Sequence, residues 1–315
     1  MGKFIHERND FNQLIQALSN EIKIDPQLIE KDYWIMHALW GMNKLGFEYE
    51  LKGGTSLSKG WKCIDRFSED IDIYIHPPKE LNLPVSKNQT KDFHIEARKN
   101  YFESLVDKLK IAGFHSVQRD EAFDDTKLMR NAGIRLIYPN LFGQIEGLKD
   151  GVLLEVGFDQ TTPNEEITIS SWVMDKAISV KLDVTNNQAV GVKCYVPEYT
   201  FVEKLQTIST KFRQQQENGQ MPINFMRHYY DVFQLLTLKR VQEFIGSEKY
   251  FAHKDLRFRS ANERDLTKND AFIISNTETQ KLFQQSFDRT KGLYYKGQPK
   301  FSDILDSLKA FLSKM

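Results

Sequence analysis

The chain has 315 residues, and because single hydrophobic cores stop growing near ~250–300 residues, we expect two domains. Its 43 Lys and Arg residues equal its 43 Asp and Glu residues, which excludes a histone-like protein coated in basic surface. The hydrophobic content of 40%, the two cysteines and the lack of any apolar run near ~20 residues predict a folded cytoplasmic protein without disulfides, secretion or a membrane span.

The first part of the chain alternates helix and strand patterns. Residues 9–20 and 27–45 have the apolar spacing of helices, and the second begins at an Asp-Pro start signal. Strands are predicted at 47–51 and at 71–75, because both runs are apolar and are bounded by turn residues. A glycine turn and a short helical stretch connect the two strands.

The middle of the chain is mainly β and the rest is mainly helical. Residues 92–112 read as an amphipathic helix that ends at Gly113. Strand patterns follow at 114–119, 127–138, 152–158, 166–169 and 192–196. Beyond Pro197, helical patterns cover 198–216, 223–245, several short elements between 253 and 290, and 302–313. These patterns predict an α/β part and an all-helical part that meet near residues 176–197.

Two aspartates stand in the strand pattern at 71–75 and its start. Asp70 and Asp72 are two residues apart, so in a strand both side chains project from the same face, close enough to share a divalent cation. Like charges side by side on an apolar strand are costly without a compensating cation. The alternative is an exposed strand with Asp on its wet face.

The glycine turn before this strand is a candidate phosphate site. Gly53 and Gly54 allow the backbone to approach a ligand closely, and the amides and hydroxyls of Thr55 and Ser56 can donate to phosphate oxygens. A glycine pair alone is more often an ordinary turn. The order of residues also does not match the P-loop motif.

Together, the glycine turn, Ser68 and the two aspartates resemble the polymerase-beta-like nucleotidyltransferase superfamily. The strings KGGTSLSK and RFSEDIDIYI are closer still to the nucleotidyl transferase AbiEii/AbiGii toxin family of bacterial toxin–antitoxin and phage-defence systems. The resemblance extends over residues 28–238, through IEKDYW at 29–34, the Lys204 region and RHYYDV at 227–232. Residues 239–315 contain no motif that we could place.

This resemblance implies an α+β fold and a two-metal reaction. The fold would have a nucleotidyltransferase-like mixed sheet with flanking helices in residues 1–190 and an all-helical domain in residues 191–315. The reaction would transfer a nucleoside monophosphate from a nucleoside triphosphate (NTP) to an acceptor hydroxyl, with Mg²⁺ or Mn²⁺ on Asp70 and Asp72. Gly53, Gly54, Thr55, Ser56 and Ser68 would hold the triphosphate.

Four further residues are candidates on the same grounds. Glu155 lies inside an apolar strand pattern and is the candidate third metal ligand; the alternatives are a plain edge-strand charge or a role for Asp159 instead. Lys204 would neutralise triphosphate charge. Asp231 is either functional or a surface partner of Arg227 on its helix. Arg66 either contacts phosphate or braces its loop.

The acceptor is less defined than the chemistry. Some relatives of this family load nucleotides onto the 3′ end of tRNA, and residues 176–315 carry 22 basic against 15 acidic residues, so RNA is the leading acceptor. The site would then lie between the acidic and the basic half, and a cognate antitoxin would be a partner, by direct contact or indirectly. The alternatives are AMPylation-like modification of a protein or small molecule, and a non-catalytic nucleotide-binding interaction protein.

Overall fold

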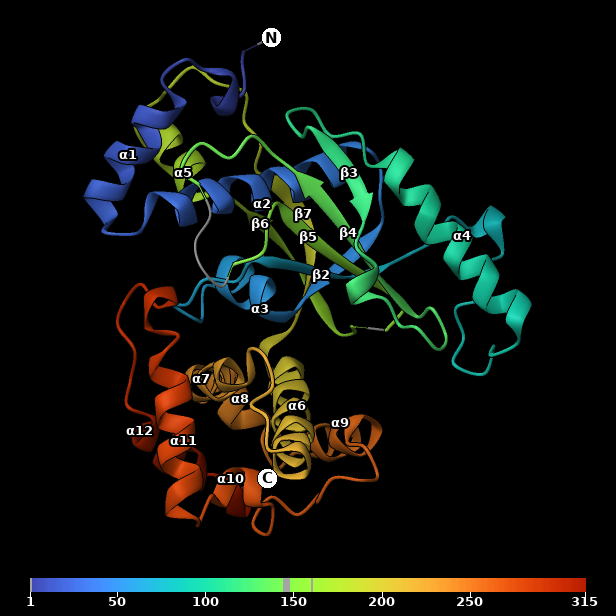
Figure 1. The fold of residues 1–315 in the computed structure, drawn as a ribbon, viewed down its shortest axis with the longest axis vertical. Helices are drawn as coiled ribbons and strands as arrows, with labels where there is room; N and C mark the ends of the chain where they lie inside the picture. The colour runs from blue at the N-terminus through green and yellow to red at the C-terminus, as the bar shows by residue number, and fades with distance from the viewer. Residues whose placement is uncertain (1, 144–147, 160) are drawn as a thin grey trace. The chain divides into compact units, whose positions relative to one another are not determined.

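The computed structural model describes residues 2–143, 148–159 and 161–315, and in them the chain forms two compact units. Unit 1 comprises Met1–Gly60 and Ser68–Tyr195, and unit 2 comprises Trp61–Phe67 and Val196–Met315. Both units are drawn in Figure 1. Among the helices of the described ranges, none has the length and apolarity needed to cross a membrane.

Unit 1 is built on a mixed sheet, which confirms the predicted fold class. In its described residues, seven strands follow the order β3-β4-β5-β2-β1-β7-β6. β2 pairs parallel with β5 and antiparallel with β1, and β1 pairs parallel with β7. The strands are β1 (Tyr49–Lys52), β2 (Asp70–Ile75), β3 (Ser116–Arg119), β4 (Asn131–Ile137), β5 (Val152–Gly157), β6 (Asn164–Ile169) and β7 (Ala189–Tyr195).

The helix α2 (Pro26–Lys44) packs against β5 and β7 and runs across the sheet in Figure 1. It begins where the Asp-Pro signal predicted, because the Asp25 side chain accepts a hydrogen bond from the amide of Gln27. The helix is buried on almost all sides, including three consecutive charged residues. Buried charges need partners, so α2 must reach polar groups in neighbouring segments.

Among the other helices of unit 1, α4 and α5 differ from the sequence prediction. α4 ends at Lys108, five residues before Gly113, and a Cβ atom at Gly113 would lie 2.6 Å from the His6 ring. That glycine therefore permits close packing in a loop. α5 was not among the predicted elements. These helices are η1 (Ile5–Glu7), α1 (Phe11–Ile22), α3 (Gly53–Thr55), the π-helical turn η2 (Ser56–Gly60), η3 (Lys79–Leu81), α4 (Asp92–Lys108), η4 (Glu121–Phe123) and α5 (Trp172–Ser179).

Unit 2 has the helical layout that the sequence predicted. Its helices are α6 (Pro197–Asn218), α7 (Phe225–Leu235), α8 (Lys239–Phe244), α9 (Glu248–Arg257), α10 (Asp270–Ile273), α11 (Thr277–Asp288), η5 (Lys291–Leu293), α12 (Phe301–Lys309) and η6 (Leu312–Lys314). Rings of Phe225, Tyr229, Phe283 and Phe301 contact one another in its core. The segment 61–67 also belongs to this unit, and its Phe67 amide donates to the carbonyl oxygen of Leu293. The stretch after residue 238, which carries no motif, therefore supplies core to unit 2.

Candidate functional site

Three carboxylates lie on one face of the sheet in unit 1. In β2, Asp70 and Asp72 alternate with Ile71 and Ile73, which are fully buried on the opposite face. β5 runs parallel beside β2, and its Glu155 lies directly opposite Asp72. Because side chains of paired residues project to the same side of a sheet, the structure brings the three predicted metal ligands together.

The glycine turn packs directly against this strand. Gly53 has a φ of +73°, and a Cβ atom there would lie 2.2 Å from Oδ2 of Asp72, so any other residue would strain the backbone and displace the carboxylate or the turn. The hydroxyl of Thr55 donates to the carbonyl oxygen of Asp70 at 2.5 Å. The turn and the aspartate strand are thereby held together. The other predicted phosphate-binding residues of unit 1 differ in exposure: Gly54 and Ser56 are buried and Ser68 is half-buried.

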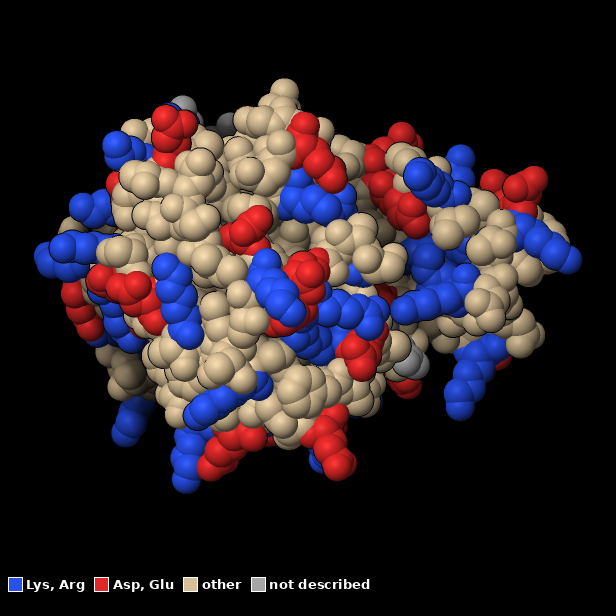
Figure 2. All heavy atoms as spheres, turned by 90° about the horizontal axis from the view of Figure 1, so that it is seen from below, with Lys and Arg blue, Asp and Glu red and all other residues tan. Residues whose placement is uncertain are grey.

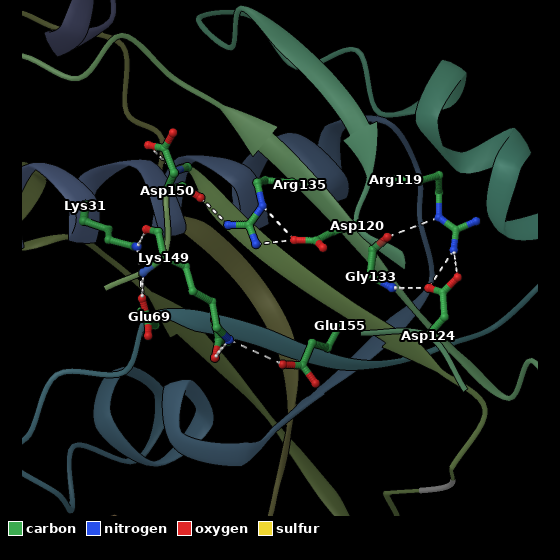
Figure 3. Close-up of polar contacts among 12 residues, drawn as sticks. Lys31, Glu69, Arg119, Asp120, Asp124, Gly133, Arg135, Lys149, Asp150 and Glu155 are labelled. Carbon is green, nitrogen blue, oxygen red and sulfur yellow. Dashed lines mark hydrogen bonds and ion pairs between the residues drawn. The ribbon is translucent and has the colours of Figure 1, made fainter. Parts of the chain in front are cut away.

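A lysine that the sequence did not single out stands among the carboxylates. Lys149 Nζ lies 2.7 Å from Oδ2 of Asp70 and 3.8 Å from Oε1 of Glu155. Figure 3 shows its side chain extending from its loop toward Glu155. The loop joins β4 to β5 and has no hydrophobic period, so no pattern could have marked this residue.

Crowding changes the proton affinity of these carboxylates. Burial, followed by the charges of Asp72 and Asp70, raises the pKa of Glu155 to about 8 against the opposing charges of Lys149 and Lys52. Burial also raises the pKa of Asp70 to about 6, with Lys149 opposing the increase and Asp72 adding to it. Near neutral pH the cluster therefore holds a proton that ordinary carboxylates would have lost.

We expect this raised pKa to make the cation-free protein less stable as the pH increases. A carboxyl group with a raised pKa stabilises the folded state fully below its unfolded pKa of about 4.3, and this contribution is lost as the pH rises through about 8. Glu155→Gln cannot ionise and should not show that loss. Its free energy of unfolding in urea with EDTA should therefore rise relative to the wild type between about pH 5 and about pH 9.

A matched control for this measurement is Glu166→Gln, which changes an exposed carboxylate of the edge strand β6. We expect this control to keep the pH response of the wild type. Identical responses of both variants would contradict a raised pKa at Glu155.

The donor chemistry of this cluster fits a divalent cation. Carboxylate oxygens are the hard ligands that Mg²⁺ and Mn²⁺ prefer. Oδ1 of Asp70 is buried and has no hydrogen-bond partner among the described residues, so it is available as a ligand. Within residues 2–143, 148–159 and 161–315, however, no three His, Cys, Asp or Glu side chains converge into a ready-made metal site. The ammonium group of Lys149 instead contacts two of the three carboxylates, Asp70 and Glu155.

A cavity of about 440 Å³ lies beside the carboxylates. Its lining includes Asp72, Glu155, Lys52, Arg130 and Asp159. The alternative ligand Asp159 thus faces the same cavity, although it lies after the end of β5. With Asp125, four carboxylates and two basic side chains line this cavity, and such a set suits a ligand that combines phosphates with a divalent cation.

The charged residues Glu30, Lys31 and Asp32 of α2 are all buried. Lys31 Nζ lies 3.1 Å from Oε2 of Glu69, the residue before the first aspartate of β2, and also donates to the carbonyl oxygen of Lys149. One side chain of α2 therefore contacts both the start of the aspartate strand and the loop that carries the lysine. The sequence resemblance included these residues of α2 but did not indicate which groups their side chains contact.

The two neighbours of this lysine hold other segments of unit 1. The Glu30 carboxylate accepts the amide of Leu141 at 3.0 Å, which positions the loop between β4 and β5. Oδ1 of Asp32 lies 2.5 Å from Nζ of Lys59, a residue of the turn that follows the glycines. The Asp32 carboxylate also accepts a hydrogen bond from the amide of Trp172 at 2.8 Å. These contacts make α2 a support for the strand, the turn and the loop of the candidate site.

In unit 2, three of the predicted residues form a buried ion cluster. Arg66 donates to both carboxylate oxygens of Asp231, at 2.6 and 2.7 Å, and Lys204 Nζ lies 2.8 Å from Oδ2. Burial alone would raise the pKa of Asp231, but the charges of Arg66 and Lys204 hold it well below its usual range. Asp231 is fully buried, so it is not the surface partner of Arg227 that the sequence allowed.

One family model and one solved structure are similar to this chain. The profile of the nucleotidyl transferase AbiEii toxin, type IV toxin–antitoxin system, matches residues 44–307. No curated protein matches the sequence significantly. The crystal structure of an antigenic nucleotidyltransferase-like protein from Paracoccidioides brasiliensis is similar over 74% of this chain and 95% of that chain, with 12% identity and a TM-score of 0.38. Because the family profile covers most of its length, the chain belongs to the AbiEii nucleotidyl transferase toxin family of type IV toxin–antitoxin systems.

Proposed function

We propose that this toxin transfers a nucleoside monophosphate from an NTP to an acceptor hydroxyl, with Mg²⁺ or Mn²⁺ as the required cation. The observation that carries the proposal is the placement of Asp70, Asp72 and Glu155 on one sheet face, with the glycine turn packed against Asp72 at Gly53. When bound there, divalent cations would stabilise the attacking and leaving oxygens of an in-line displacement.

The residues of unit 1 then have distinct roles. Asp70, Asp72 and Glu155 would hold the cations through hard oxygen ligands. The main-chain amides of the glycine turn would bind the triphosphate, because the Thr55 hydroxyl already donates to the strand. The cavity would give the NTP a position next to Asp72 and Glu155, where Lys52 would offset phosphate charge.

In unit 2, the ion cluster supports different roles for its two basic residues. All three nitrogens of the Arg66 guanidinium donate within the unit, two to Asp231 and one to the carbonyl oxygen of Phe67, which favours a bracing role. The cluster holds two cations against one carboxylate, so its charges sum to a single positive charge. A phosphate group would compensate that charge, and Lys204 is the member that we propose for this contact.

For the acceptor, we propose RNA, with the 3′ end of tRNA as the leading candidate. The excess of basic residues in 176–315 supports attraction to a nucleic-acid backbone. On the face shown in Figure 2, basic and acidic side chains are interspersed. The proposal of an RNA acceptor therefore rests on the charge composition of residues 176–315, and it specifies no binding groove.

The test is incubation of the purified protein with each labelled NTP, Mg²⁺ and total RNA. We expect labelled RNA that ribonuclease removes, and only background label with Asp70→Ala or Asp72→Ala. Label that follows protein or a small product and resists ribonuclease would indicate AMPylation-like chemistry instead. NTP binding without any transfer would indicate a non-catalytic nucleotide-binding protein, and equal labelling by the Asp variants would refute the mechanism.

The toxin role can be tested in cells. We propose that the protein acts in the cytoplasm and that expressing it arrests growth, because transfer to an essential RNA would block translation. Co-expression of the cognate antitoxin should relieve the arrest. Asp72→Ala should not arrest growth at the same protein level, and arrest by that variant would separate toxicity from the transfer reaction.

A further inference from the structure

The ammonium group of Lys149 lies close to two of the candidate metal ligands, Asp70 and Glu155. Its Nζ is 2.7 Å from Oδ2 of Asp70 and 3.8 Å from Oε1 of Glu155, and Asp70 and Glu155 lie on the two strands that form the candidate cation site. Two cations cannot share these oxygens without strong repulsion at such distances. A divalent cation on Asp70 and this ammonium group must therefore compete.

The loop that carries this lysine is held by main-chain atoms. The Lys149 amide donates to Oε2 of Glu69 at 2.7 Å, and its carbonyl oxygen accepts from Lys31. The next carbonyl oxygen, of Asp150, accepts from Arg135, as Figure 3 shows. Because all three contacts use the backbone, the Lys149 side chain can move while the loop stays in place.

The side chain of Lys149 is flexible and partly exposed. A lysine side chain carries its charge on a flexible four-carbon stem, and that of Lys149 is 22% exposed. In its present position Nζ also lies 4.4 Å from the centre of the Phe123 ring, so the ion pair with Asp70 is not its only favourable contact. Because the side chain is partly exposed, an ammonium group that leaves Asp70 can be hydrated on its flexible stem.

We propose that Lys149 is an internal competitor of the divalent cation at Asp70 and Glu155. It neutralises these carboxylates in the cation-free protein and withdraws from Asp70 when Mg²⁺ or Mn²⁺ binds. The inference rests on the proposed function, which places the cation at these carboxylates. The divalent cation must displace the ion pair between Lys149 and Asp70 before it binds, and this competition lowers the affinity of the site for the cation.

The test measures Mn²⁺ binding to the full-length protein without nucleotide, from the electron paramagnetic resonance signal of free Mn²⁺. Lys149→Gln removes the charge and keeps the backbone contacts, so we expect Mn²⁺ to bind about tenfold more tightly, equivalent to about 1.4 kcal/mol. Lys149→Arg keeps the charge and should not tighten binding. Lys110→Gln, at an exposed lysine of the same unit, should bind Mn²⁺ as the wild type does.

A second measurement separates competition from a structural role. In EDTA, Lys149→Gln should unfold at a lower temperature than the wild type, because its carboxylates lack a counter-charge. Adding Mn²⁺ should then raise its unfolding temperature more than that of the wild type, since tighter binding stabilises the folded state more. Unchanged or weaker Mn²⁺ affinity in Lys149→Gln would overturn the proposal.

Failure of this inference can be distinguished from failure of the proposed function. Asp72→Asn should abolish Mn²⁺ binding if the cation site is at these carboxylates. If it does, and Lys149→Gln still binds like the wild type, only the competition is refuted. If Asp72→Asn binds Mn²⁺ normally, the cation site lies elsewhere, and both the proposed mechanism and the competition fail.

Discussion

Replacing Gly53 by alanine should reduce nucleotidyl transfer by about a hundredfold, because a shift of about 1 Å in a reacting group has effects of this size. The new Cβ atom would lie 2.2 Å from Oδ2 of Asp72, so the carboxylate or the turn must move. Gly53 also has a φ of +73°, a conformation that alanine adopts only with strain. Transfer and Mn²⁺ binding should both weaken, and both can be measured on the same protein.

Gly46→Ala is the matched control for this variant. Gly46 has a φ of +76°, almost the same backbone conformation, but nothing lies within 4 Å of the Cβ position. We expect both variants to lose about 1 kcal/mol of stability from the backbone conformation. Only Gly53→Ala should lose transfer and Mn²⁺ binding. Equal activity losses in the two variants would show that strain, and not contact with Asp72, limits the reaction.

Replacing Asp231 by asparagine should lower the free energy of unfolding by about 3–5 kcal/mol, the cost of breaking a buried ion pair by removing one partner. The substitution leaves Arg66 and Lys204 buried without the carboxylate that both contact. Arg66 lies in residues 61–67, the segment before the aspartate strand, and Asp231 lies in α7. The substitution would therefore also weaken the contact between this segment and α7. Urea unfolding of the full chain, followed by circular dichroism, measures the loss.

The control for this variant is Asp265→Asn. Asp265 pairs with Lys268 at 2.8 Å in the same unit, but its side chain is 41% exposed, so its loss should change stability little. Lys204→Met adds a test of function, because Asp231 keeps both bonds to Arg66 and the fold should survive. If Lys204→Met loses transfer at near-normal stability, Lys204 serves the reaction. Wild-type stability in Asp231→Asn would contradict the ion-cluster account.

Local patterns predicted the parts of the site that depend on local geometry. Asp70 and Asp72 share a face because strands repeat every two residues, and this holds wherever the strand packs. Glu155 was predicted as an acid within an apolar strand, and the sheet placed that strand parallel to β2. The two-residue period could not specify this register, because it depends on pairing between residues more than eighty positions apart.

The ion pairs of the site were not predictable in the same way. Lys149 lies in a loop without a hydrophobic period, and the side chains of α2 that hold this loop come from more than a hundred residues earlier. The partners of Asp231 likewise come from α6 and from the segment 61–67. No periodicity encodes such contacts, because they depend on which surfaces the hydrophobic core brings together.

By itself, the sequence indicated the family, the positions of most helices and strands, and the two aspartates and the glycine turn as candidate site residues. These properties depend on residue type and on spacing within a few positions. Only the tertiary structure placed Glu155 beside Asp72 and brought the ammonium group of Lys149 into an ion pair with Asp70. It also assigned residues 61–67 to the helical unit. The physical reason is that charges separated along the chain interact only after packing has brought them within a few ångströms in a partly dehydrated site.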